Sequence, residues 1–416
     1  MRTHSARTAI GSRTDTDDDA EAGRRRRLPM PALLALATAV FITSLTETLP
    51  AGLLPAMSAD LGVGESAMGQ TVTIYAIGTA LTAIPLTAAT AGWRRKRLLL
   101  TAMAGFAVAN TVTAVSSDYS LMMVARFVAG VAAGLAWALL AGYARRLAPL
   151  HLQGRAIAIA MSGIPVALSL GVPAGTFLGR ALDWRVAFLV MTALTVVLLA
   201  WITATVPDHP GRRRDGRTPV LRTFRIPGVA QVLFVTLVFV LAHTILYTYI
   251  ATFLDRLGMG DSTDLVLLVF GAASLVSIWI VGAAISRRLR TLTIASVLLV
   301  AAAAAVLAVP AGSPVLVHVA VALWGLGWGG APTLLQSAAS EAAGDEADAA
   351  QGAQAMLVTL WNAAMAGGGV VGGVLLDIFG SKAFPWSVLV LMLPVAAVVT
   401  AARAHGFPAR RASATR

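Results

Sequence analysis

Two residues of this 416-residue chain that are charged at neutral pH, one acidic and one basic, lie well inside long apolar stretches. Among the 20 acidic residues only Glu47 is placed in this way, and Arg126 is the only base that lies as deep. A charge surrounded by apolar residues is costly, most of all in a membrane, and it persists mainly for function. Glu47 is therefore a candidate for alternately binding a proton and a solute, with Arg126 as its partner. The alternative is a fixed ion pair that only positions two helices.

A second group of candidates combines aromatic rings with hydrogen-bonding side chains. His243 and Tyr247 are four residues apart, as are Trp324 and Trp328, so each pair lies on one helical face. His243 is also the second titratable candidate for a proton site. A buried or lipid-facing structural role is an equally good interpretation of any one of these side chains. The residues that we expect to share one cavity are Trp137, His243, Tyr247, Trp328, Gln336 and Asn362.

Motifs for other chemistry are absent from the sequence. There is no phosphate-binding loop, HExxH-type metal site or nucleophile elbow, and the glycine-rich segments 325–330 and 367–373 lie within apolar stretches, where they predict packing surfaces. Cysteine is also absent, which excludes disulfides and thiolate metal sites. We therefore expect no metal, no cofactor and no enzymatic activity.

These candidate residues must be held by helices in a membrane. Hydrophobic residues make up 57% of the chain and charged residues 12%, whereas a soluble domain carries about a quarter charged residues. Apolar stretches of roughly 20 residues, the length that crosses a hydrocarbon core of about 30 Å as a helix, recur along the chain. We predict an all-α integral membrane protein with twelve transmembrane helices, at 30–56, 66–91, 97–116, 120–144, 156–179, 185–206, 228–254, 264–285, 292–309, 315–338, 352–376 and 384–403. Tryptophans near span ends are expected to anchor at the membrane interface, namely Trp93, Trp184 and Trp386.

Basic residues are unevenly divided between the two sets of loops. The tails and the even-numbered loops carry 27 Lys or Arg, and the odd-numbered loops carry only Arg180, Arg185, Arg256 and Lys382. Positively charged loops resist translocation. We therefore predict a multi-pass protein of the inner (plasma) membrane with both termini in the cytoplasm. This distribution accounts for the net charge of +12 without a nucleic-acid partner.

The basic loop 207–227 divides the chain into halves that repeat weakly. At an offset of 194 residues Gly175, Gly179, Leu182 and Asp183 align with Gly369, Gly373, Leu376 and Asp377, and at 195 Gly130 and Gly134 align with Gly325 and Gly329. Two parallel six-helix repeats with a site between them are a transporter architecture. The expected organisation is a disordered tail at 1–28, a six-helix bundle at 29–206, a linker at 207–227, a second six-helix bundle at 228–403 and a tail at 404–416.

Three motifs carry a family resemblance. The first span contains Thr46-Glu47-Thr48-Leu49-Pro50-Ala51-Gly52-Leu53-Leu54-Pro55, followed by Asp60-Leu61-Gly62, and resembles the first helix of the drug/proton antiporter branch of the major facilitator superfamily. Arg126 with Gly130 and Gly134 resembles the fourth-helix pattern of that branch, and Gly171-Val172-Pro173-Ala174-Gly175 with Gly179 resembles its fifth-helix antiporter pattern. The chain is similar over residues 30–403 to bacterial sugar, nucleoside and chloramphenicol exporters.

Two loops depart from the family pattern. Residues 92–97 keep only the basic part of a loop that in relatives also has a Gly and an Asp and forms a charge latch. The segment 341–348 carries Glu341, Asp345, Glu346 and Asp348 where basic residues are expected. We have no physical account of that acidity.

The resemblance implies a major facilitator fold in which the first and fourth helices line a central cavity. Glu47 and Arg126 are then expected to be hydrogen-bonded directly or coupled through water. It also implies proton-coupled export of a small organic solute, such as a drug, sugar or nucleoside, by a monomer that works by alternating access. The alternatives are a proton-independent facilitator or importer and, in another class, a membrane-embedded enzyme or sensor. Gly130 and Gly134 are expected mainly to pack helices, and Pro165 and Pro173 to bend the fifth span.

Overall fold

The computed structural model describes residues 28–407 apart from 91, 212–223, 310–312, 345–346 and 404. Helices account for nearly all of these residues, and none of them is in a strand. The predicted tail up to residue 27 and most of both the 207–227 linker and the 404–416 tail lie outside the described residues. His405 to Phe407, which we assigned to the tail, turn back onto the bundle, where Phe407 is buried.

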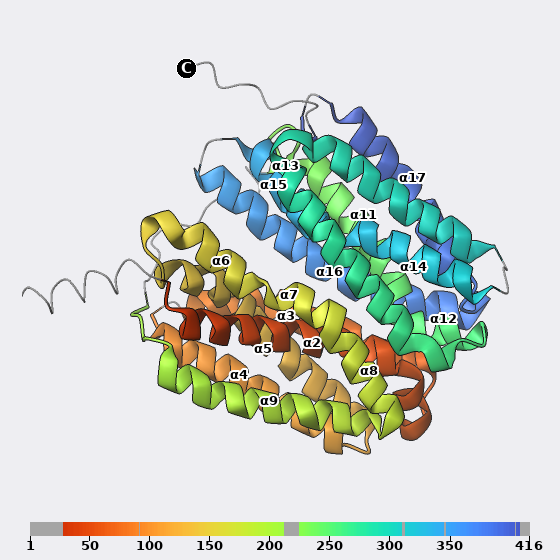
Figure 1. Ribbon diagram of the computed structural model, residues 1–416, viewed down its shortest axis with the longest axis horizontal. Helices are drawn as coiled ribbons and strands as arrows, with labels where there is room; N and C mark the ends of the chain where they lie inside the picture. Colours follow the sequence, from red (N-terminus) through yellow and green to blue (C-terminus); the bar gives the residue numbers. More distant parts are fainter. Residues whose placement is uncertain are drawn as a thin grey trace, which may run out of the picture.

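Two bundles of helices lie side by side (Figure 1). The N-terminal bundle consists of α2 (Met30–Leu61), α3 (Glu65–Ala89), α4 (Arg95–Val115), α5 (Tyr119–Arg146), η1 (Leu150–Leu152), α6 (Gln153–Met161), α7 (Gly163–Val166), η2 (Ala167–Gly171), α8 (Val172–Ala181) and α9 (Trp184–Thr205). The C-terminal bundle consists of α11 (Val229–Thr248), α12 (Ile250–Arg256), η3 (Gly260–Ser262), α13 (Thr263–Ala308), α14 (Pro314–Trp328), α15 (Ala331–Ala343), α16 (Ala347–Phe379) and α17 (Ala383–Ala401).

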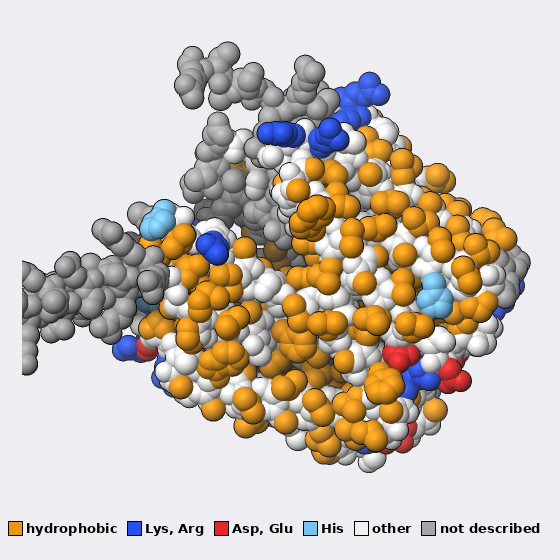
Figure 2. Space-filling model, viewed as in Figure 1, with side chains coloured by type: hydrophobic (Ala, Val, Ile, Leu, Met, Phe, Trp, Pro, Cys, Tyr) orange, Lys and Arg blue, Asp and Glu red, His pale blue; other side chains and the backbone are white. Residues whose placement is uncertain are grey.

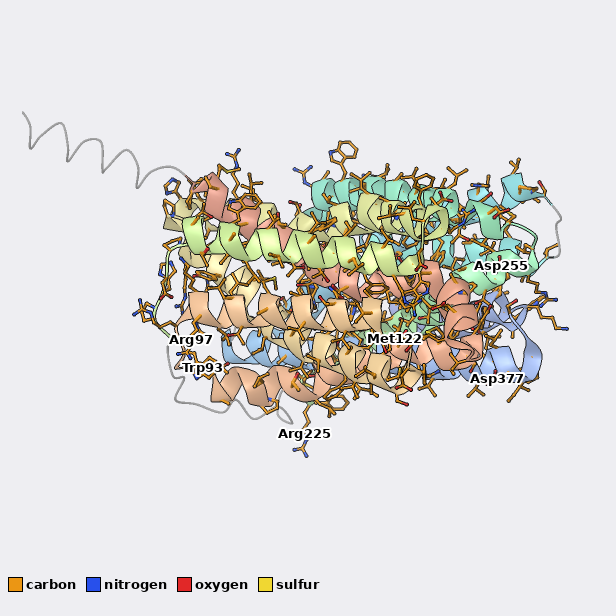
Figure 3. The ribbon with its side chains drawn as sticks, turned by 90° about the horizontal axis from the view of Figure 1, so that it is seen from below. Trp93, Arg97, Met122, Arg225, Asp255 and Asp377 are labelled. Carbon is orange, nitrogen blue, oxygen red and sulfur yellow. The ribbon has the colours of Figure 1, made fainter. Side chains whose placement is uncertain are left out.

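The helices run between two ends of the molecule. Figure 3 shows Trp93 and Arg97 at one end and Asp255 and Asp377 at the other. We call these the proximal end, where α2 begins and α17 ends, and the distal end. Between the ends the surface shown in Figure 2 is mostly hydrophobic, and the charged side chains gather near its margins. Such a wide apolar belt is what a bilayer requires and what a soluble monomer avoids.

The predicted twelve crossings are confirmed. Ten helical stretches of the described chain are long and apolar enough to cross a membrane. One of these stretches, α13, contains two crossings. Its backbone leaves helical geometry at Arg288 (φ −136°). The helix then runs back, so that Val306 lies beside Leu257 at the distal end. The 25-residue helix α3 adds the remaining crossing.

Several predicted boundaries were wrong. The first span was expected to end at residue 56, but α2 continues to Leu61 because its stop signal is Gly62, whose φ of 63° ends the helix in a left-handed cap. The seventh span breaks at Tyr249 into α11 and α12. The fifth span contains the π-helical segment η2, in which the Val172 N–H bonds to the Ala167 carbonyl. Pro173 lacks the N–H that an α-helical turn needs there, so the expected bend takes the form of a π-bulge.

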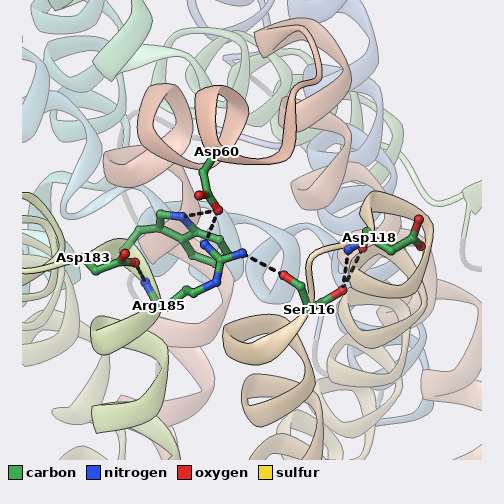
Figure 4. Close-up of polar contacts among 6 residues, drawn as sticks. Asp60, Ser116, Asp118, Asp183 and Arg185 are labelled. Carbon is green, nitrogen blue, oxygen red and sulfur yellow. Dashed lines mark hydrogen bonds and ion pairs between the residues drawn. The ribbon is translucent and has the colours of Figure 1, made fainter.

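Figure 4 shows a polar cluster at the distal end that corrects the assignment of Trp184. Trp184 was expected at the lipid interface but is 3% exposed, and its indole donates to Asp60 at 3.3 Å. Asp60, near the end of α2, is also ion-paired with Arg185. Asp183 caps the start of α9, where its carboxylate accepts a hydrogen bond from the Arg185 amide at 2.7 Å. This cluster joins α2 to the start of α9.

The glycines of the fourth- and fifth-helix family motifs lie where helices pack closely together. A Cβ at Gly130 would lie 2.1 Å from the carbonyl oxygen of Tyr75 on α3, so α5 and α3 touch backbone to backbone. Gly134 is buried farther along α5. Gly171, Gly175 and Gly179 face the side chains of Phe41, Leu49 and Leu53 on α2.

Gly130→Ala is expected to destabilise the protein by about 3 kcal/mol or more, because the added methyl meets backbone that cannot move aside. The matched control is Gly142→Ala on the same helix, where nothing lies within 4 Å of the added Cβ. The control should stay within about 1 kcal/mol of wild type. Thermal unfolding of both variants in detergent makes the comparison. Equal melting temperatures would show that the α3–α5 contact can relax and that Gly130 is not required for packing.

Candidate functional site

A cavity of about 320 Å³ lies between the two bundles. All six residues that we expected to share a cavity line it, and so does Glu47. Its remaining walls come from α2, α3, α7, η2, α11, α13, α15 and α16, through Ser44, Thr48, Ala51, Val72, Ile164, Leu168, Val240, Thr244, Thr248, Phe270, Pro332, Leu357, Val358, Trp361 and Met365. Both bundles therefore contribute to one chamber near the middle of the membrane.

One wall of the cavity is a stack of aromatic rings. The His243 imidazole lies parallel to the Trp328 indole, with ring centroids 3.4 Å apart and an interplanar angle of 3°. Tyr247 follows at 5.2 Å from His243, and Phe270 packs beside both. Trp324 lies behind this wall and does not line the cavity. Rings of this kind present flat apolar faces that favour planar ligands.

The hydrogen bond between Trp324 and His243 assigns the tautomer of His243. The Trp324 indole N–H donates to His243 Nδ1 at 3.2 Å. Because an indole nitrogen can only donate, Nδ1 must be unprotonated, and in the neutral ring the hydrogen is on Nε2. Protonation of Nδ1 would break this bond and bury a charge among apolar rings. His243 thus serves as a hydrogen-bonding wall residue and is a poor candidate for the proton site.

Glu47 lies near the middle of the 32-residue helix α2 and faces the cavity. Within the described residues its carboxyl group has no hydrogen bond and no ion-pair partner closer than 4 Å; its interaction with Arg126 is electrostatic. The hydroxyl of the neighbouring Thr48 donates its hydrogen to the Ser44 carbonyl at 2.8 Å, and so not to Glu47. The carboxyl group is thus free to exchange a proton or to accept a hydrogen bond from a ligand.

Arg126 is fully buried on α5 and is held by backbone and aromatic partners. Its Nη1 donates to the Thr46 carbonyl at 2.8 Å and its Nε to the Thr71 carbonyl at 3.5 Å. The guanidinium lies 4.9 Å from the centre of the Tyr75 ring, a cation–π contact. The direct hydrogen bond with Glu47 that we considered is not formed. Arg126 is instead a fixed positive charge, bound to the carbonyl of the residue that precedes Glu47.

The cavity is closed off from the distal end by contacts between the bundles. Arg180 on α8 pairs with Asp261 at 3.0 Å and with Asp264 at 2.9 Å. Deeper in, Gln70 on α3 donates to the Gly369 carbonyl at 3.2 Å, and the Tyr249 hydroxyl donates to the Ser66 carbonyl at 3.3 Å. Lining residues such as Gln336 and Val358 extend the cavity toward the proximal end. The distal contacts must break if the same cavity is to open at the other end.

Sequence reasoning missed three side chains of the site. Trp361 and Phe270 line the cavity, and Tyr75 holds Arg126. Trp361 had a usable signal, since it directly precedes Asn362 on the same helix. Phe270 and Tyr75 had none, because a single aromatic residue in an apolar span is typical of ordinary packing. In the described part of the chain no group of three or more His, Cys, Asp or Glu is placed to hold a metal ion.

The structure explains the contacts of one of the two loops that depart from the family pattern but not those of the other. The 92–97 loop is tied to the end of its own bundle, where Arg94 is ion-paired with Asp208 and the Lys96 amide donates to the same carboxylate at 3.2 Å. In the acidic segment, residues 345 and 346 lie outside the described part, and Glu341 is on α15. The acidity of 341–348 still has no physical account.

Comparisons with known proteins agree with this architecture. The Major Facilitator Superfamily profile matches residues 36–366. The transcription regulatory protein OpdE of Pseudomonas aeruginosa is 31% identical over 377 residues, which is 89% of this chain and 93% of that protein. The purine ribonucleoside efflux pump NepI of Escherichia coli K12 is 27% identical (89% and 93% covered) and the chloramphenicol efflux pump Rv0191 of Mycobacterium tuberculosis 29% (83% and 86%). The fold resembles the solved structure of a mutant of the nucleoside transporter NupG, with a TM-score of 0.72, 14% identity and coverage of 90% and 99%.

Proposed function

Because this chain belongs to the Major Facilitator Superfamily, we propose that it exports a small organic solute across the plasma membrane in exchange for protons. The observation that carries the proposal is Glu47, a carboxyl group without a hydrogen-bond partner among the described residues, in a cavity shared by both bundles. Two of the relatives are named as efflux pumps. The chain acts as a monomer in this proposal, since one chain already supplies both halves of the cavity.

Proton exchange follows from the placement of the two charges. Arg126 is fixed by the Thr46 and Thr71 carbonyls, so its charge does not move when Glu47 gains or loses a proton. A carboxyl group in a cavity that opens to one side and then the other can take a proton from the first compartment and release it to the second. Solute and proton compete for the Glu47 carboxylate, and this competition couples their movements.

The cavity walls favour a solute with a planar ring. The aromatic rings of Tyr247, Phe270 and Trp361 line the cavity and suit such a ring. Gln336 and Asn362 supply hydrogen bonds at its edges. The volume of about 320 Å³ is at the lower end of the range for pockets that hold drug-sized ligands. Nucleosides and ring-containing drugs therefore fit better than acyclic solutes.

The function is tested with wild-type protein in proteoliposomes. A thermal-shift screen of nucleosides, ring-containing antibiotics, sugars and amino acids first identifies a ligand, because a molecule that binds the folded state raises its apparent stability. Proton-coupled export predicts that this ligand releases protons from the purified protein and moves against its gradient when a pH gradient is imposed. Transport that equilibrates the ligand and ignores the pH gradient would identify a facilitator instead.

The proposed orientation places the proximal end, with both termini and the 207–227 loop, in the cytoplasm. Because the natural chain has no cysteine, single cysteines can be introduced at Ser12, Thr218 and Ser413, and at the distal positions Ser117 and Ser262. An impermeant thiol reagent applied to intact cells is expected to label the distal cysteines at once and the others only after permeabilisation. The reverse pattern would invert the topology.

A further inference from the structure

A small pocket lies at the distal end of the C-terminal bundle, away from the central cavity. Its volume is about 90 Å³, and it is enclosed by α12, the end of α13, the start of α14 and the residue before α17. Two side chains of its lining are cationic, those of Arg256 and Lys382. The remaining lining is apolar and consists of Phe253, Leu257, Val306, Leu307, Ala308, Val309, Leu316 and Val317.

The two cations are unusual for their location. Among the described residues only four Lys or Arg lie at the distal end, and two of them, Arg180 and Arg185, are ion-paired with aspartates of neighbouring elements. Within the described part of the chain Arg256 and Lys382 have neither an ion-pair partner nor a side-chain hydrogen bond, yet they line the same pocket. Two cations that line one small pocket repel each other when no anion is bound between them. An anion between them removes that cost.

Two helix starts add to the positive potential. α14 begins at Pro314 and α17 at Ala383, and neither has a side chain that caps its first turn. The N-terminus of a helix carries a partial positive charge that favours anions; the amides of Leu316, Ala383 and Phe384 already donate to backbone carbonyls, so here the helix ends contribute through this charge. The two cations and the two helix N-termini therefore all favour a negatively charged group.

The mouth of the pocket lies at the level of the membrane interface. Trp386, one turn beyond Lys382 on α17, is 55% exposed, and exposed tryptophans of this kind mark the headgroup region. Val309 and Val315, beside the pocket, are 61% and 69% exposed. An occupant therefore meets a positive rim and, next to it, apolar surface that faces the acyl chains.

We propose that this pocket binds an acidic phospholipid. The headgroup phosphate lies between Arg256 and Lys382, and one acyl chain follows the apolar surface of Leu316 and Val309. Juxtaposed basic residues select acidic lipids over zwitterionic ones. Since the pocket joins α12, α13, α14 and α17, the bound lipid ties together four parts of the C-terminal bundle. This proposal is independent of the solute and of proton coupling.

The test uses the full-length protein, depleted of lipid in a mild detergent, and native mass spectrometry. The probes are phosphatidylglycerol, phosphatidylcholine with the same acyl chains, and inorganic phosphate. Wild type is expected to retain one phosphatidylglycerol about tenfold or more tightly than phosphatidylcholine, and R256Q/K382Q is expected to lose this preference. The control R155Q/R287Q removes two exposed arginines at the proximal end and should keep it.

Three outcomes would overturn the proposal. An equal loss in both double variants would show general attraction to a positive protein. Displacement of the retained lipid by millimolar inorganic phosphate would identify a soluble anion as the ligand. Phosphatidylglycerol with a photoreactive acyl chain must also cross-link wild type at the end of α13 or the start of α14, and cross-links spread evenly over the bundle would exclude the site. If R256Q/K382Q does not fold, the single variant K382Q, which changes an exposed residue, is compared with wild type instead.

Discussion

Glu47→Gln is expected to abolish solute accumulation driven by a pH gradient, with a loss of about 100-fold or more, to the level of protein-free liposomes. Glutamine keeps the shape and the hydrogen-bonding capacity of the side chain but cannot carry a proton. Solute exchange without a gradient is expected to survive, because the glutamine amide can still hydrogen-bond the solute and the other cavity walls are unchanged. The measurement is flux in proteoliposomes that contain equal amounts of wild-type and variant protein.

The same variant separates a coupling role from a structural one. Glu47 has no hydrogen bond or close ion pair among the described residues, so its replacement should change the free energy of unfolding by no more than about 1 kcal/mol. The matched control is Glu65→Gln, the same change at the first residue of α3, outside the cavity lining. If Glu47→Gln still concentrated solute at the wild-type rate, the proton site would have to lie elsewhere.

Arg126→Ala is expected to be the most damaging single substitution, costing about 3–5 kcal/mol of stability. The change leaves the carbonyls of Thr46 and Thr71 without their donor and empties the space beside the Tyr75 ring, and both losses are expensive in a buried site. Arg126→Lys keeps the charge but not the geometry of the guanidinium. We expect the Lys variant to fold with reduced stability and the Ala variant to yield little folded protein, measured by thermal unfolding in detergent.

A double-mutant cycle that combines Glu47→Gln with Arg126→Ala measures the interaction free energy between Glu47 and Arg126. If the field of Arg126 stabilises the Glu47 carboxylate, Arg126→Ala costs less stability in the Glu47→Gln background, with a coupling energy of about 1 kcal/mol or more. A coupling energy of zero would mean that Arg126 serves only to bind α2 and α3. The proposed coupling would then rest on Glu47 alone. Arg126→Lys provides a folded partner for the cycle if the Ala variant cannot be purified.

The sequence by itself determined the class of structure and the rough level of the two charges. Apolar stretches of membrane-spanning length leave a chain no stable arrangement except helices in a bilayer, because backbone groups in lipid must bond within their own segment. The same scarcity of charge made Glu47 and Arg126 stand out. Helical spacing also placed His243 and Tyr247 on one face, as the structure has them.

Only the tertiary structure decided which atoms meet. The direction of the Arg126 donors, toward the carbonyls of Thr46 and Thr71, depends on how α2, α3 and α5 are packed. The tautomer of His243 is set by Trp324, 81 residues away in sequence. Trp184 is buried where its position near a span end predicted exposure. Periodicity defines a residue's face and depth within its own helix, but contacts between helices depend on their relative tilt and rotation, which are set by side chains distant in the sequence.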